Sequence, residues 1–262
     1  MNPSQQQYQI MKNVITCTYL FFSKYVYDIS YFSLNQIVES IDINKDIKAL
    51  GGTLADAPKE GASTIFPSEN VSETLILIDL MYFGDSLNKL CAAVVHELIH
   101  IHDFHVIANN FHNGDITTIA KWDLLDAYVV YSEFHASLIE DKIVQQFLNV
   151  ANHTDNNLIL DACIKNFEVM FQYACEQCKK TKILPNTWHN YFGHIYETEL
   201  YFKDTENVIR NKYLCQMFSS DRQLEIAKSI YNLCRNLCQS ENHTYHEFLE
   251  LKHLVDSLSP TK

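Results

Sequence analysis

The chain has 262 residues, of which 47% are hydrophobic, 20% are charged and 12% are aromatic. This composition excludes a mainly disordered chain, because enough apolar side chains are present to bury a core. The net charge is −12, from 20 Lys and Arg against 32 Asp and Glu. Few basic residues are therefore available for the positive face with which proteins bind nucleic acid or an anionic membrane. With only 6 Gly and 5 Pro, a turn-rich β-sandwich or barrel is also excluded, and we expect mainly helix.

The first 73 residues predict two helices and then an irregular stretch. Residues 5–27 have the pattern of an amphipathic helix. Ser33 and Gln36 form a capping-box pattern, which predicts a short second helix near 34–42. Half of the glycines lie in 43–73, together with two prolines, and we expect this stretch to be largely non-helical.

Two β-rich runs predict a small sheet. Ser63–Phe66 and Thr74–Leu80 are separated by a turn-forming tetrad at 67–70, which favours a hairpin or two adjacent strands. The second run is almost entirely apolar, and this is typical of a strand covered on both faces.

The remainder of the chain is predicted to be helical. Asp85 can cap a long helix over 86–108, which the residues at 109–115 interrupt, and another helix is expected over 123–148. Helical patterns continue over 158–258, with breaks near 180–186, 202–205, 218–221 and 239–242. The order of helix, small sheet and helices predicts an α+β, predominantly helical fold.

No segment of the sequence has the features of a membrane anchor or a secretory signal. Val14–Phe22 is apolar but is less than half of the roughly 20 residues that span a bilayer, and no cleavage site follows it. The eight cysteines are scattered through apolar helical patterns, so we expect reduced, buried thiols and a cytoplasmic protein. An alternative is a structural zinc site built from Cys175, Cys178, Cys234 and Cys238 with His243 and His246.

The residues that carry chemistry are His96-Glu97-Leu98-Ile99-His100, an HExxH motif. On a helix, positions i and i+4 lie on one face, so both imidazoles can bind a single metal ion. Glu97 is rotated by roughly 100° from His96, close enough to reach a water on the metal without binding the metal itself. Zinc lowers the pKa of such a water, and the glutamate then acts as general base.

The helix that contains the motif has two distinct faces. The two histidines of the motif lie nearly opposite the apolar positions, so that one face is available for the core and the other for a metal. The apolar positions are Leu87, Cys91, Val94, Leu98 and Ile101. His102 and His105 project away from the face of His96 and His100 and are poor ligands on an unbroken helix.

A catalytic zinc usually has three protein ligands and a water, so a third ligand must come from elsewhere. Glu133 borders the apolar stripe of the next helix, and this partly buried placement suits a carboxylate ligand. His112, in the intervening loop, is the rival third ligand. A third interpretation is that Asp126, Glu133 and Glu140, spaced by seven, form a solvated acidic edge.

The arrangement ILID, helix, HELIH, helix, SEFHA resembles the compact gluzincin metallopeptidases of the ImmA/IrrE type, which cleave repressor proteins. The resemblance covers about residues 40–145. It implies a core of three helices and a small sheet, zinc held by His96, His100 and Glu133, and Glu97 as the base. Ile99 stands where family members often have glycine, and no helix-turn-helix partner domain is visible in the sequence.

These observations predict a cytoplasmic zinc metallopeptidase with a zincin-like domain at 1–150 and an all-helical region at 151–262. The small sheet should pack on the HExxH helix and on the helix that carries Glu133. The expected partner is a protein or peptide substrate, with no nucleic acid and no membrane. Alternatives are a binding protein that keeps a metalloprotease scaffold without cutting, and a helical module with accidental histidines. Candidate donors to the developing oxyanion are Tyr128, Tyr131, His189, His194 and Tyr196.

Overall fold

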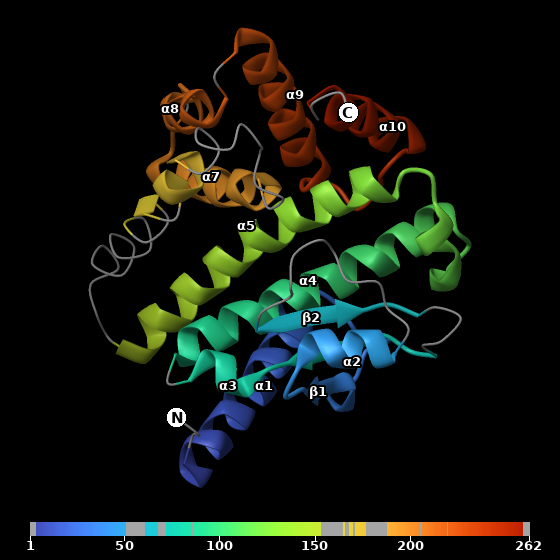
Figure 1. Ribbon diagram of the computed structural model, residues 1–262, viewed down its shortest axis with the longest axis vertical. Helices are drawn as coiled ribbons and strands as arrows, with labels where there is room; N and C mark the ends of the chain where they lie inside the picture. The colour runs from blue at the N-terminus through green and yellow to red at the C-terminus, as the bar shows by residue number, and fades with distance from the viewer. Residues whose placement is uncertain are drawn as a thin grey trace. The chain divides into compact units, whose positions relative to one another are not determined.

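The computed structural model describes residues 4–50, 61–67, 72–84, 86–152, 165, 168–169, 171–176, 188–204, 206–218 and 220–258. The chain divides into two compact units, residues 1–121 and 122–262. The fold is α+β and predominantly helical, as the sequence predicted (Figure 1). The domain boundary that we expected at residue 150 remains a prediction.

The first unit, in the residues that the structure describes, combines four α-helices with a three-stranded sheet. α1 contacts α4, and both α4 and α2 contact β2 (Figure 1). The elements are α1 (Gln5–Tyr25), the 3-10 turn η1 (Leu34–Gln36), β1 (Ile37–Glu39), α2 (Ile43–Ala49), β2 (Ala62–Ile65), β3 (Leu75–Ile78), α3 (Leu80–Phe83), α4 (Leu87–Phe111) and the 3-10 helix η2 (Ile116–Lys121).

The sheet has the order β1-β3-β2, with β3 parallel to β1 and antiparallel to β2. The predicted pairing of the two β-rich runs is confirmed, since Ala62 lies opposite Ile78 and Ile65 opposite Leu75. The side chains of Ile76, Leu77 and Ile78 are at most 3% exposed. The prediction that this strand is covered on both faces is therefore confirmed as well.

The helix predicted near 34–42 is wrong. Gln36 Oε1 does accept a hydrogen bond from the Ser33 amide at 2.7 Å, as the capping pattern requires. However, Gln36 Nε2 donates to the Thr74 carbonyl at 2.9 Å, and the chain then enters β1, where Ile37 lies opposite Ile76. Main-chain pairing with β3 satisfies the backbone over several residues, and it outweighs a local signal that supports a single turn.

The stretch 43–73, expected to be largely non-helical, begins with a helix. α2 is capped by Asp42, whose carboxylate accepts a hydrogen bond from the Lys45 amide at 3.0 Å. Ile43 and Ile47 lie four positions apart on its buried face, in one apolar cluster with Ile65 and Leu77. Tertiary burial of this short amphipathic face explains the helix, since an isolated seven-residue helix is marginal in water.

α4 is the core helix of the first unit. Val94, Leu98 and Ile101, on the predicted apolar stripe, are fully buried. The helix begins at Leu87 and continues to Phe111, past the predicted end, while the predicted cap Asp85 lies outside the described residues. Among the described helices, α4 alone is long and apolar enough to cross a membrane. Buried core helices of soluble proteins have the same length and composition, and 67% of the most apolar 18-residue segment of α4 is buried.

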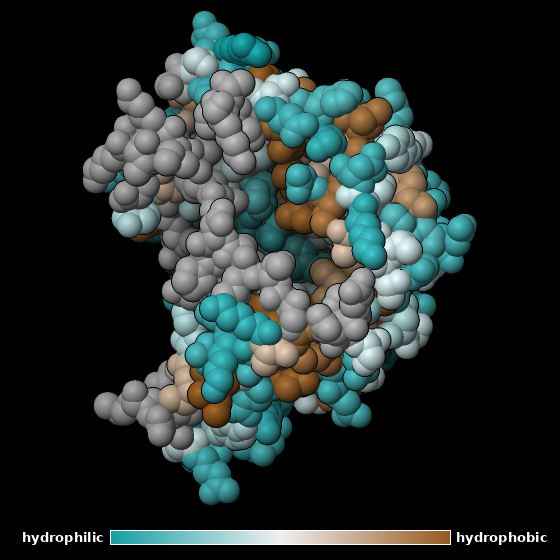
Figure 2. Space-filling model, turned by 45° about the vertical axis from the view of Figure 1, so that its right-hand side comes forward, coloured by the Kyte–Doolittle hydropathy of each residue, from teal (hydrophilic) through white to brown (hydrophobic). Residues whose placement is uncertain are grey.

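The described surface is mixed in character. On the face shown in Figure 2, hydrophilic residues are interleaved with patches of hydrophobic residues.

Six described cysteines are free thiols: Cys91, Cys175 and Cys234 are buried, Cys238 is half-buried, and Cys17 and Cys215 are exposed. The prediction that the thiols are buried is therefore wrong for the two exposed cysteines. Cys17 lies on α1 and Cys215 on the helix Val208–Met217, both at positions that face solvent.

The second unit is helical in its described part. α5 and α7 make its most extensive contact. The predicted breaks at 202–205, 218–221 and 239–242 are confirmed, whereas the one at 180–186 lies outside the described residues. The elements are α5 (Leu125–Asn152), α7 (Trp188–Phe202), α8 (Val208–Met217), α9 (Asp221–Leu237) and α10 (Tyr245–Leu258).

The contact between α5 and α7 depends on Gly193. A Cβ atom at this position would lie 2.3 Å from the Phe134 carbonyl oxygen and 2.8 Å from Ser137 Cβ. The two backbones therefore approach each other more closely than any side chain permits.

Replacing Gly193 by Ala should destabilise the protein by about 1–3 kcal/mol, because the added methyl group overpacks a contact with a main-chain oxygen that cannot move alone. Urea denaturation measures the change as a lower midpoint. Helix propensity alone predicts the opposite sign, a gain of about 1 kcal/mol for Ala over Gly. An unchanged or raised midpoint would therefore contradict the close approach.

Candidate metal centre

The two histidines of the HExxH motif come from neighbouring turns of α4. Both side chains are half-buried. Their ring centroids are 4.7 Å apart, and the ring planes meet at 83°. Spacing by four residues on a continuous helix produces this proximity, as the sequence predicted. The intervening Leu98 is fully buried, so the helix presents the imidazoles on a face different from its core face.

The glutamate of the motif is held by the sheet. Glu97 is 8% exposed, and its Oε2 accepts a hydrogen bond from Thr64 Oγ1 on β2 at 2.6 Å. The same hydroxyl lies 3.4 Å from the Glu97 carbonyl oxygen. A hydroxyl donor stabilises the ionised carboxylate and fixes its orientation, while Oε1 remains available to accept a proton.

Glu133 lies on α5 and is half-buried. Its Oε2 accepts a hydrogen bond from Asn190 Nδ2 on α7 at 3.0 Å. Further along the same two helices, His194 Nδ1 lies 2.5 Å from Asp141 Oδ2. Burial, together with the nearby Asp141 carboxylate, raises the pKa of Glu197 to about 7. Glu133 thus lies at one end of a row of polar groups between α5 and α7. Because its carboxylate contacts α7, Glu133 is not part of a solvated acidic edge.

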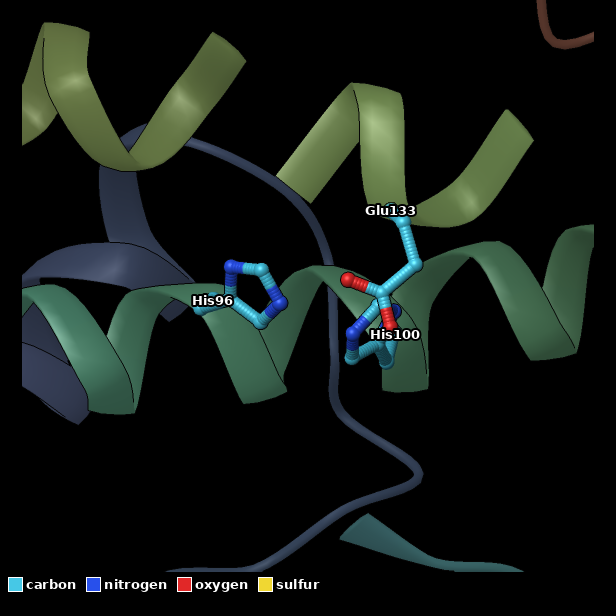
Figure 3. Close-up of side chains that lie close together, drawn as sticks. All are labelled: His96, His100 and Glu133. Carbon is cyan, nitrogen blue, oxygen red and sulfur yellow. The ribbon is translucent and has the colours of Figure 1, made fainter. Parts of the chain in front are cut away.

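The ligand atoms of His96, His100 and Glu133 all lie within 4.8 Å of one another, and this group could hold a metal ion (Figure 3). Figure 3 shows the three side chains, with the imidazoles carried by α4 and the carboxylate of Glu133 by α5. Two imidazole nitrogens and one carboxylate oxygen are the donor set of many catalytic zinc sites. The structure therefore brings together the three residues that the sequence singled out as ligands.

The other histidines considered as ligands are not in this group. His112, the rival third ligand, follows the end of α4, and its Nδ1 lies 2.9 Å from Thr118 Oγ1. His102 stacks on Tyr27, with centroids 3.9 Å apart, and His105 stacks on Tyr31 at 3.6 Å. Burial, and secondarily the nearby His102, lowers the pKa of His105 to about 4, so its ring is neutral at pH 7.

Two further predictions concern a structural zinc site and the donor to the oxyanion. Within the described part of the chain, no second group of three metal-ligating side chains gathers, although Cys178 lies outside that part. Of the candidate oxyanion donors, Tyr131 is buried with its hydroxyl 3.5 Å from His243 Nε2, and His194 contacts Asp141. The identity of the donor stays a prediction.

The sequence did not single out Thr64, and it assigned no individual role to Asn190. Thr64 lies in a predicted strand. Nothing in the local sequence indicates a contact with the HExxH motif. Asn190 lies in 188–194, a segment rich in aromatic and imidazole groups, for which the sequence offers two interpretations: core with polar tips, or a segment that faces the cleft from the helical half. Their roles depend on the packing of β2 on α4 and of α7 on α5.

A comparison of the chain with known proteins finds no significant match to a family model, to a curated protein or to a solved structure.

Proposed function

We propose that the protein is a zinc-dependent metallopeptidase of the gluzincin type, similar to the ImmA/IrrE proteins, that hydrolyses peptide bonds in the cytoplasm. The observation that carries the proposal is the grouping of His96, His100 and Glu133, together with a buried Glu97 beside the two histidines. A purely structural metal site has no use for a fourth residue whose carboxylate does not bind the metal and is oriented by its own hydrogen bond.

Each residue has a defined task in this proposal. His96, His100 and Glu133 would hold the ion. When bound, zinc supplies a Lewis acid that polarises the scissile carbonyl and makes water more acidic. Glu97 accepts the proton of the attacking water at Oε1 and delivers it to the leaving amine. Thr64 keeps Oε2 engaged, so that the carboxylate does not rotate between these two transfers.

The substrate in this proposal is an extended peptide that pairs with β2. Among the described strands, β2 pairs with β3 alone, and its other edge is the one at which we propose that a peptide strand adds. Thr64 on this strand donates a hydrogen bond to Glu97, which supports a substrate path beside the proposed general base. A peptide added to β2 would therefore run past the residue that activates water.

The test is digestion of a peptide library, prepared from the cell's own proteome, by the zinc-loaded protein and by its Glu97→Gln variant. Cleavage that depends on zinc and on Glu97 is the expected result. Zinc binding without any cleavage would instead favour a binding protein that retains a metalloprotease-like scaffold. A protein that binds no metal would favour a helical module with accidental histidines.

Replacing Thr64 by Val, which keeps the shape and removes the hydroxyl, should lower kcat by about 10-fold to 100-fold. A hydrogen bond to a charged group contributes about 1.5–3 kcal/mol, and each 1.4 kcal/mol corresponds to about tenfold in rate. Steady-state kinetics on a peptide found in the library checks this. Thr64→Ser restores the donor and should recover most of kcat, whereas equal losses in both variants would show that only packing matters here.

A further inference from the structure

We propose that Asn190 is a positioning residue for the metal group: it engages one carboxylate oxygen of Glu133, so that the other oxygen is offered to the ion. This inference rests on the proposed function, because it takes His96, His100 and Glu133 as the ligands. It adds a residue from α7, which belongs neither to the HExxH motif nor to the helix of the third ligand.

The hydrogen bond itself selects between the two oxygens of Glu133. Asn190 Nδ2 donates to Oε2 at 3.0 Å in a partly buried setting. A hydrogen bond to an ionised acceptor is about twice as strong as one between neutral groups. An oxygen engaged in this way is a weaker ligand, and Glu133 is thereby directed to bind through one oxygen, as a tetrahedral site with an open position requires.

The position of Asn190 relative to Glu133 is set by main-chain contact. Gly193 lies one turn further along α7, where a Cβ atom would come within 2.3 Å of the Phe134 carbonyl oxygen. Phe134 directly follows Glu133 in the chain. The two backbones are therefore fixed against each other beside the hydrogen bond, so that the Asn190 amide is aligned before any metal binds.

The second polar atom of the amide indicates that this contact is specific. Asn190 Oδ1 is buried and has no hydrogen-bond partner in the described part of the chain. The reverse orientation of the amide would place this oxygen against the Glu133 carboxylate, and two acceptors repel each other. An apolar side chain would fill the same space without an orphaned acceptor, so the donor to Glu133 is the feature that asparagine supplies.

The experiment measures metal affinity and the spectrum of the cobalt-loaded protein, in the full chain. Asn190→Leu keeps a similar branched shape without a donor, and Asn190→Ala is the smaller second variant in case the first does not fold. Both should bind Zn2+ about 10-fold to 100-fold more weakly in competition with a chromophoric chelator, the usual effect of losing an outer hydrogen bond to a metal ligand. With Co2+, the visible absorption should weaken, because both oxygens of Glu133 can then bind and the coordination number rises.

The matched control is Asn236→Leu, at an exposed asparagine on α9, which should bind both ions like the unaltered protein. Zn2+ affinity and a Co2+ spectrum unchanged in either folded Asn190 variant would overturn the inference and leave the proposed function standing. An equal loss in Asn236→Leu would overturn it too, because the effect would not be local. If the unaltered protein bound neither ion, both this inference and the proposed function would fail.

Discussion

The Glu97→Gln variant should bind zinc as the unaltered protein does and should lose peptide cleavage. Glutamine has nearly the same shape, and its side-chain oxygen can still accept the hydrogen bond from Thr64. It cannot take a proton from water at neutral pH, however, and general-base catalysis contributes about 100-fold to 10,000-fold to the rate. The measurement is kcat/KM on one peptide from the library digest, with zinc content determined in parallel.

Two controls make the Glu97 result specific. Thermal unfolding of Glu97→Gln should match that of the unaltered protein, because the substitution preserves volume at a side chain that is 8% exposed. Glu140→Gln changes a glutamate on α5 that is not in the ligand group and should leave cleavage unaffected. Retained cleavage in Glu97→Gln would exclude Glu97 as the base.

The Glu133→Ala variant should lose most of its zinc. A site with two histidines alone lacks one of the three protein ligands that catalytic zinc sites usually have. The loss of affinity should exceed the effect of about 10-fold to 100-fold that is typical of an outer residue. Elemental analysis of the purified variant, after dialysis against a weak chelator, gives the zinc content per chain.

The matched control for Glu133 is Asp126→Ala on the same helix. Asp126 lies seven residues earlier and is exposed, so its removal should leave zinc content unchanged. Equal losses in both variants would point to a general acidic surface effect. Full zinc occupancy in Glu133→Ala would show that the third ligand is another residue, and His112 would be the first to replace.

Local chemistry explains which features could be predicted in advance. The proximity of His96 and His100 follows from helix geometry alone, since residues four apart share a face wherever the helix packs. The apolar stripe of α4 and the apolar run of β3 were recognisable for the same reason, because burial imposes a period on the sequence. The α+β class followed from the order of these periodic segments.

Tertiary contacts decided the remainder, because they join residues whose local sequence carries no such period. The capping pattern of Ser33 and Gln36 is compatible both with a short helix and with a single turn that leads into a strand. The pairing of Ile37 with Ile76 selected the strand. Thr64 and Asn190 are short polar side chains that acquire a role only where β2 meets Glu97 and α7 meets Glu133. A carboxylate 33 positions after the second histidine could be proposed as a ligand from its burial, but its approach to the imidazoles depends on the packing of the whole chain.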